Sequence, residues 1–390
     1  MSRKRKINSL LALVLLLCII FFFSFTNLGT AFRDINILML TGKKINMEER
    51  FEDLKDMEET KNYDIYLTGE MHGTELSFKM QEYMAKYFIE KQGVKYILLE
   101  GQISEAELLN RYLKTGDAEI IKNLINSFKG TFADNQNTYD LFEFYYKYNK
   151  QLPDDKKVSF VGIDVENSFS VTSEYLRYLI KDLGEPDEKI KNMIKRINKY
   201  RDGNDQFLFD DLRKSLKEDE EEYKEFFGED FFYFKKVIEN TFWENNTARE
   251  AIMVKNFQDF YEKLPKGKYY GQLGKSHVYK LIRTGNNGGE DPINTFANSI
   301  NNDYEPTKGK VYSIIYVYMN SYYRSDGIEE PYGEINIPYF KGKGSVRLYT
   351  KDNNKKAYKI FERWGAQEGL LGDVTFILKD SKGSTKINKE

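Results

Sequence analysis

Cysteine and histidine are scarce in this sequence, which has one cysteine and two histidines among 390 residues. The cysteine, Cys18, lies in an apolar run near the N-terminus, so the rest of the chain has no disulfide, no thiolate metal site and no cysteine nucleophile. Other catalytic signatures are missing too, because the chain has no H-E-x-x-H motif, no complete G-x-S-x-G motif and no Walker or Rossmann glycine pattern. Chemistry that needs an imidazole must therefore use His72 or His277.

The charge of the chain is nearly balanced, with 59 basic and 61 acidic side chains and a net charge of −2. Without an excess of positive charge, we expect no nucleic-acid partner. Aromatic residues make up 15% of the chain, so many of them must be buried or must line a pocket.

The N-terminus has the layout of an export signal. Four basic residues, Arg3–Lys6, precede an apolar run from Leu10 to Phe23, and this order is typical of a signal peptide or signal anchor. We therefore expect residues 1–32 to be either cleaved near Ala31 or retained as a single membrane anchor. Because the basic flank stays inside, the rest of the chain is expected outside the cytoplasm.

The remaining chain alternates between strand and helix patterns. We expect residues 33–60 to form a connector and residues 61–390 to form one α/β domain. Short apolar segments predict strands at Tyr63–Thr68, Val94–Leu99, Lys157–Ile163, Lys268–Leu273 and Lys310–Met319. Helical patterns between them predict a mostly parallel central sheet flanked by helices. A charged helical insertion is expected over residues 167–246, and short strands over 333–380 predict an antiparallel edge towards the C-terminus.

Polar residues follow several of the predicted strands, at the points where each strand ends. These residues are Glu70 with His72, Glu100, Asp164 with Glu166, and Gly274 through His277. Ligands bind outside the carboxyl ends of parallel strands, so we expect these side chains to share one crevice. Both histidines also end a Gly-x-x-His turn, and this shared pattern favours a functional role over two unrelated buried histidines.

An imidazole titrates near neutral pH and suits either general-base work on water or metal binding. A carboxylate beside it, from Glu70, Glu100 or Asp164, would fix its tautomer and raise its basicity. Arg249 begins a predicted helix and could bind a substrate carboxylate or stabilise an oxyanion. The alternative for Arg249 is a surface salt bridge.

Taken together, these segments resemble the erythromycin esterase-like family. The matching stretches are Gly69–Glu75, Gln92–Val94, Leu99–Gly101, Tyr148–Lys150 leading into Val158–Asp164, Arg249–Asn256 and Gly274–His277. The resemblance covers about residues 63–170 and 247–320. The wider superfamily includes the TraB and Tiki proteins, which carry two Gly-x-x-His motifs, and the ChaN haem-binding lipoproteins, which share the first motif.

The resemblance implies a hydrolase that uses activated water and no serine nucleophile. His72 would be the base, and Glu70 and Glu100 would orient it or the water. His277 would assist, bind substrate or ligate a metal ion. We expect an extracytoplasmic enzyme that cleaves an ester, or less readily an amide, in a small-molecule or peptide substrate. This activity requires no cofactor.

The chain departs from the family at two positions, and two other functions stay open. Only Met71 separates Glu70 from His72, where the esterases usually have two residues, and Gly274 stands where they have a histidine. One alternative is a metal-dependent peptidase of the Tiki type, with a divalent ion held by His72, His277 and Glu70. The other alternative is a non-catalytic protein that binds haem or another small ligand.

Overall fold

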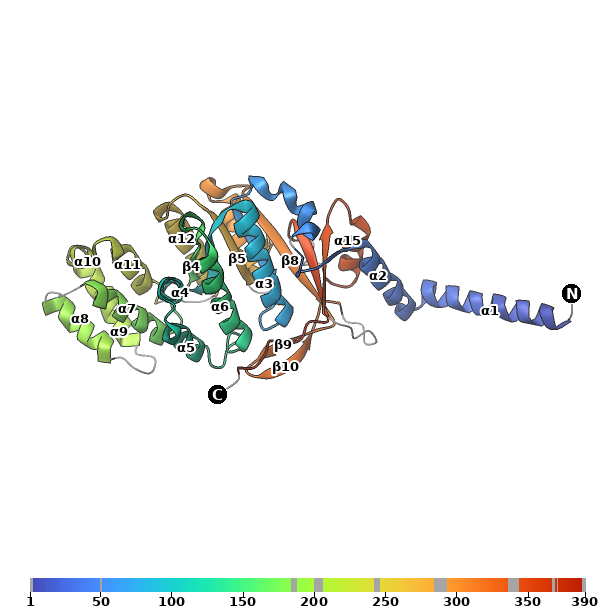
Figure 1. The fold of residues 1–390 in the computed structure, drawn as a ribbon, viewed down its shortest axis with the longest axis horizontal. Coiled ribbons are helices and arrows are strands. Elements are labelled where there is room, and N and C mark those ends of the chain that lie inside the picture. Colours follow the sequence, from blue (N-terminus) through green and yellow to red (C-terminus); the bar gives the residue numbers. More distant parts are fainter. Residues whose placement is uncertain are drawn as a thin grey trace.

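Within the described part of the chain, an eight-stranded sheet forms the centre of the protein (Figure 1). The computed structural model describes residues 3–49, 51–183, 188–199, 206–241, 246–283, 293–335, 344–366, 369 and 371–387. In spatial order the strands are β1 (Lys43–Ile45), β11 (Ser345–Thr350), β12 (Val374–Lys379), β8 (Val311–Met319), β2 (Ile65–Glu70), β5 (Lys268–Gly274), β3 (Val94–Gln102) and β4 (Ser159–Asp164). The strands from β12 to β4 pair in parallel, and β11 and β1 add antiparallel pairs at one edge. The predicted α/β fold with an antiparallel C-terminal edge is confirmed.

Helices and two small hairpins surround this sheet. The helices are α1 (Arg3–Phe25), α2 (Asn27–Thr41), α3 (Glu75–Tyr87), α4 (Ile103–Thr115), α5 (Ala118–Ser127), α6 (Gln136–Gln151), α7 (Phe169–Leu183), α8 (Glu188–Lys199), α9 (Gln206–Glu218), α10 (Glu220–Phe227), α11 (Phe231–Glu239), α12 (Asn246–Lys263), α13 (Lys275–Val278), α14 (Phe296–Asn302) and α15 (Lys355–Arg363). The hairpins pair β9 (Ser321–Ser325) with β10 (Ile328–Tyr332), and β6 (Ile282–Arg283) with β7 (Ile293–Asn294).

Two neighbouring tyrosines on β5 show that helices cover both faces of the sheet. The ring of Tyr269 packs against Phe257 of α12, with centroids 5.4 Å apart. The ring of Tyr270 packs against Phe88, which directly follows α3, at 5.2 Å. Successive side chains on a strand point to opposite faces, so α12 and α3 lie on opposite sides of β5.

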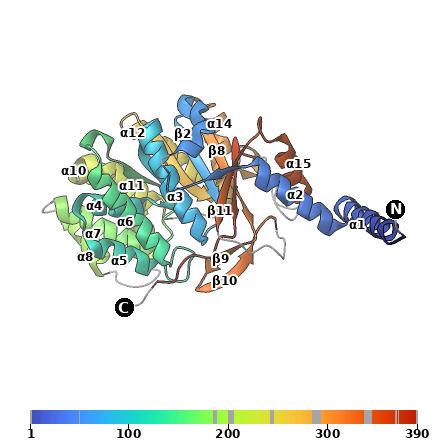
Figure 2. The same ribbon diagram turned by 45° about the vertical axis from the view of Figure 1, so that its right-hand side comes forward.

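The predicted helical insertion is also confirmed, and it lies beyond β4 at one end of the sheet. Helices α7 to α11 form this part of the molecule, and α7 and α11 contact α4 (Figure 1). Its core includes the stacked rings of Phe227 and Phe234, with centroids 4.1 Å apart, and Tyr223 beside them. Figure 2 shows from a second direction that α1 and α2 lie at the opposite end of the molecule.

Residues of α2 pack against the C-terminal part of the domain. The buried carboxylate of Asp34 accepts hydrogen bonds from Arg363 Nη1 at 2.6 Å and from Trp364 Nε1 at 3.0 Å. Ala31 and Leu38 are buried beside α15. The expected boundary between the export segment (residues 1–32) and the connector (residues 33–60) falls among these packed residues. Both segments stay predictions.

No helix in the described ranges combines the length and the apolar character needed to cross a membrane. The expected N-terminal membrane anchor is therefore not supported by the structure.

Two asparagine side chains close the outer edge of β4. Asn149 of α6 accepts from Val158 N at 2.7 Å and donates to Val158 O at 2.9 Å. Asn110 of α4 does the same for Phe160, at 2.7 and 3.0 Å. An edge strand leaves its outward N–H and C=O groups without a neighbouring strand, and these amides take that place. They also fix α4 and α6 against the strand that ends at Asp164.

We predict that Asn149→Ala lowers the free energy of unfolding by about 1–3 kcal/mol, because both buried backbone groups of Val158 lose their partner. Chemical denaturation followed by circular dichroism measures this loss. Asn126→Ala is the matched control, since Asn126 is exposed on α5 and should change stability by less than about 0.5 kcal/mol. Equal stability of the two variants would show that the amide does not support the edge strand.

Candidate active site

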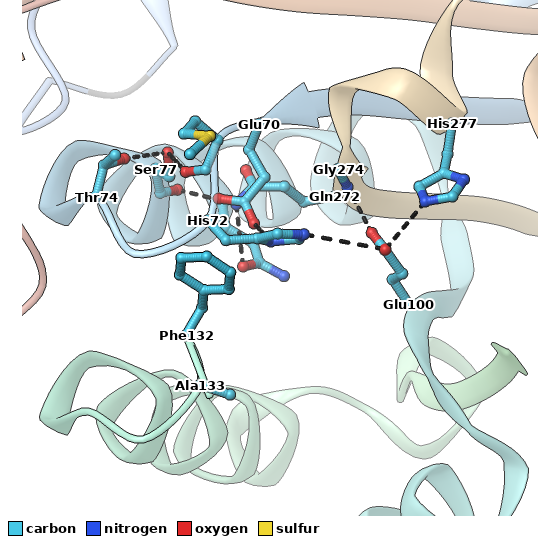
Figure 3. Close-up of polar contacts among 12 residues, drawn as sticks. Glu70, His72, Thr74, Ser77, Glu100, Phe132, Ala133, Gln272, Gly274 and His277 are labelled. Atoms are coloured by element: carbon cyan, nitrogen blue, oxygen red, sulfur yellow. Dashed lines mark hydrogen bonds and ion pairs between the residues drawn. The ribbon is translucent and has the colours of Figure 1, made fainter. Parts of the chain in front are cut away.

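The carboxyl ends of neighbouring strands bring most of the predicted site residues together (Figure 3). Glu70 ends β2, and His72 follows it by two residues. Glu100 lies near the end of β3, and Gly274 ends β5 immediately before α13, which carries His277. β5 lies between β2 and β3 in the sheet, so these residues meet at one edge of it.

The carboxylate of Glu100 is the centre of this cluster. Its Oε2 accepts from the backbone N–H of Gly274 at 2.5 Å. Its Oε1 lies 3.1 Å from both His277 Nε2 and Arg249 Nη2, and 4.0 Å from His72 Nε2. Burial by itself would raise the pKa of Glu100, but these cationic neighbours hold it well below its usual range. Glu100 is therefore ionised over the whole physiological pH range.

His72 is held on one nitrogen and open on the other. Its Nδ1 lies 2.7 Å from Glu70 Oε1, and its ring lies beside Phe132 with centroids 5.8 Å apart. The 4.0 Å between Nε2 and Glu100 Oε1 exceeds a hydrogen bond, and the side chain is 41% exposed. Nε2 is thus available to a ligand. Burial opposes protonation of His72, but Glu70 and then Glu100 outweigh it and raise its pKa to about 9.

His277 is held on both nitrogens and is buried. Besides its contact with Glu100, its Nδ1 lies 2.6 Å from Glu250 Oε1. The other oxygen of Glu250 accepts from the backbone N–H of Phe296, the first residue of α14, at 3.0 Å. Burial opposes protonation, but Glu100 and Glu250 together raise the pKa of His277 to about 10. His277 is therefore placed to orient Glu100, and both of its ring nitrogens are already engaged.

Arg249 joins Asp164 to the cluster. Its Nε donates to Asp164 Oδ1 at 2.8 Å, and its Nη2 contacts both Asp164 and Glu100. The Asp164 side chain is only 3% exposed, so this pair is an internal ion pair. The guanidinium already faces two carboxylates, and a role in binding a substrate carboxylate stays a prediction.

A cavity of about 570 Å³ opens beside His72, which is within the usual range for small-molecule sites. Glu70, His72 and Glu100 line it together with polar residues such as Gln81, Gln102 and Gln272. Its apolar wall consists of Phe78, Leu99, Phe128, Phe132, Leu141, Phe142, Phe169 and Val171. Among the lining residues that the structure describes, none is lysine or arginine. The cavity therefore suits a ligand without negative charge that has apolar parts and a polar group near His72.

The predicted metal ligands do not converge on one point. Among the residues that the structure describes, no group of three or more His, Cys, Asp or Glu side chains is arranged to hold a metal ion. His72 Nδ1 faces Glu70, and the two nitrogens of His277 face Glu100 and Glu250. The nitrogen and oxygen atoms that would bind a metal ion contact one another instead, so this arrangement does not fit a metal-dependent peptidase that holds a divalent ion.

A comparison with known proteins finds the same family that the sequence motifs resemble. Residues 89–269 match the family model described as erythromycin esterase. Over this stretch the chain is similar to the erythromycin esterase family. The match supports a hydrolase-like function, and no curated protein matches the sequence.

Three solved structures share the fold along nearly their whole lengths, each with a TM-score of 0.61. A Bacillus cereus protein is 18% identical, with 92% of this chain and 99% of that chain covered. A succinoglycan biosynthesis protein is 14% identical, with 93% and 100% covered. A variant of the erythromycin esterase EreC in its open conformation is 12% identical, with 90% and 99% covered. At these identities the likeness establishes the fold.

Gly274, one of the two departures from the family pattern, lies at the centre of the cluster. A Cβ atom on Gly274 would come within 3.2 Å of His72 Nε2, 3.3 Å of Glu100 Oε2 and 3.5 Å of His277 Cδ2. A histidine at this position would fill the space between the two histidines and crowd the carboxylate. Glycine leaves that space open.

Sequence reasoning did not assign a role to Glu250 or to the aromatic residues beside His72. Glu250 follows Arg249 in the same helix, and this position beside Arg249 is the only feature of the sequence that could have marked it as a site residue. Phe132 lies in the connection between α5 and α6, and no motif marks it.

Proposed function

We propose that this protein is a hydrolase that cleaves an ester bond in a small molecule without negative charge, with His72 as the base that activates water. The observation that carries the proposal is the geometry of His72. Its Nδ1 is held by Glu70, its Nε2 lies 4.0 Å from Glu100 Oε1 and beyond hydrogen-bond distance, and the side chain lines a cavity with polar and apolar walls. An imidazole oriented by a carboxylate is the usual arrangement of a histidine general base.

Each neighbour of His72 has a separate part in this reaction. Glu70 accepts the Nδ1–H of His72 and so leaves Nε2 as the nitrogen that takes a proton from water. As the water oxygen attacks the ester carbonyl carbon, the imidazole becomes a cation that Glu70 and Glu100 stabilise. His277 and Arg249 hold Glu100 in position from its other side.

The elevated pKa of His72 sets a condition on this mechanism. With a pKa of about 9, most molecules carry a protonated His72 at neutral pH, and that form cannot accept a proton. The neutral form is a strong base, but at pH 7 only a small fraction of the molecules carry it. Water activation by His72 therefore requires an alkaline optimum.

We predict that His72→Ala lowers kcat by about 10²- to 10⁴-fold, the usual contribution of a positioned base. The assay uses 4-nitrophenyl butyrate and, because an esterase of erythromycin shares the fold, erythromycin. Glu70→Gln should cause a smaller loss, because it removes the charge that orients His72.

The matched control for Glu70→Gln is Glu75→Gln. Glu75 lies on α3 and pairs with Lys79 outside the cavity, so its substitution should leave kcat unchanged. An added chelator should also leave the rate unchanged, whereas loss of activity would favour a metal-dependent peptidase. Full activity of His72→Ala, with its circular dichroism spectrum unaltered, would remove His72 from the reaction.

The pH profile gives a second prediction. For 4-nitrophenyl butyrate, kcat/KM should rise with pH and reach half of its maximum near pH 9, because only neutral His72 accepts a proton. Glu70→Gln should move the midpoint to lower pH, since a carboxylate that raises the pKa of His72 is gone. A rate that falls as pH rises through about 9 would instead make protonated His72 the active form.

We also infer that the enzyme acts outside the cytoplasm. The support is the order of Arg3–Lys6 and the apolar run from Leu10 to Phe23. Fractionation of cells that produce the full chain should recover the domain from the extracytoplasmic side. Recovery from the cytosol alone would contradict this location.

A further inference from the structure

Glu105 is a buried carboxyl group that the mechanism above leaves unused. It lies in the first turn of α4, is 8% exposed, and lines the same cavity as His72 and Glu100. A Cβ atom on Gly101 would come within 2.8 Å of Glu105 Oε2, so the carboxyl group lies against the backbone directly after Glu100. Within the described ranges, Glu105 has no hydrogen-bond or ion-pair partner.

Several donors near the start of α4 bind a different residue, Glu166. Glu166 accepts from the backbone N–H of Ser104 at 3.0 Å and from the Ser104 hydroxyl at 2.6 Å. It also accepts from Thr172 Oγ1 at 2.7 Å and Gln102 Nε2 at 3.1 Å. Glu105 receives none of these donors, although it lies in the same turn. Its negative form would therefore be uncompensated.

The charged groups around Glu105 also make its ionised form less favourable. Burial raises its pKa first, and the nearby carboxylates of Glu166 and Asp164 add to the increase, which brings the pKa to about 8. Arg249 is bound to Asp164 and Glu100 and does not reach Glu105. At neutral pH the cavity thus contains a protonated carboxyl group whose partner must come from the ligand.

We propose that Glu105 is the acid that protonates the leaving oxygen of the ester, and this rests on the proposed hydrolase function. His72 takes a proton from water as the water oxygen bonds to the carbonyl carbon. The bond between that carbon and the leaving oxygen breaks, and the proton of Glu105 passes to the leaving oxygen. The proton on His72 returns to Glu105 through solvent, so the net change is ester plus water to acid plus alcohol.

The leaving group of the substrate tests this assignment. Ethyl butyrate and 4-nitrophenyl butyrate share an acyl group, but ethoxide is a strong base that needs a proton to leave, whereas 4-nitrophenolate leaves without one. We predict that Glu105→Gln, which keeps the size of the side chain, lowers kcat for ethyl butyrate by about 10²- to 10⁴-fold. The loss for 4-nitrophenyl butyrate should be less than about tenfold, because this ester needs no acid.

Glu107→Gln is the matched control. Glu107 lies two residues later on α4, and burial also raises its pKa, to about 7. It lines a separate cavity of about 700 Å³ along the outer edge of β4. Its substitution should change the hydrolysis of neither ester.

The same variants give a pH signature that a structural role would not produce. Hydrolysis of ethyl butyrate by the unaltered protein should stop rising at about pH 8 and decline above about pH 9, because loss of the Glu105 proton offsets the gain of neutral His72. With 4-nitrophenyl butyrate, and in Glu105→Gln, the rate should instead keep rising through about pH 9 and show no decline.

The outcomes separate the two proposals. An equal loss for both esters, or no loss for either, would overturn the acid role of Glu105 while leaving the hydrolase intact. If the unaltered protein cleaves neither butyrate ester nor erythromycin, the proposed function fails, and the role of Glu105 fails with it. A loss confined to ethyl butyrate, with Glu107→Gln unaffected, supports Glu105 as the acid.

Discussion

The ionised carboxylate of Glu100 is the interaction on which the rest of the site depends. A buried carboxylate is costly unless hydrogen-bond donors surround it, and here the donors come from separate elements. Gly274 supplies a backbone N–H from the end of β5, His277 an imidazole from α13, and Arg249 a guanidinium from α12. The charge of Glu100 thus couples the ends of two strands to two helices and raises the pKa of His72 across the remaining gap.

The environment gives two neighbouring carboxyl groups opposite protonation states. Glu100 is surrounded by donors and cations and has a lowered pKa. Glu105 has no donor among the residues that the structure describes, faces carboxylates and has a raised pKa. They are five residues apart in the chain and line one cavity. Groups whose environments push their pKa values apart are the usual basis for separating acid and base roles. The cations of His277, His72 and Arg249 lower the pKa of Glu100, whereas burial and the carboxylates of Glu166 and Asp164 raise the pKa of Glu105.

Much of the fold and the centre of the site could be predicted from the sequence. Apolar strands that end in Glu70 or Glu100 are local patterns, and the rule that ligands bind at the carboxyl ends of parallel strands brings them together. The two Gly-x-x-His turns placed His72 and His277 at that same edge for the same reason. The alternation of strands and helices predicted the sheet and the helical insertion. Crossover connections between parallel strands are almost always right-handed, so few other topologies are possible.

The sequence alone therefore determined which residues end the strands and that their side chains meet at one edge of the sheet, since periodicity and chain direction fix both. Only the tertiary structure decided how those residues differ. Three differences depend on how helices rotate and pack against the sheet: the burial of His277 against Glu250, the exposure of His72 beside Phe132, and the raised pKa of the buried Glu105. Helix packing follows from contacts between distant segments, and no local pattern in the chain encodes it.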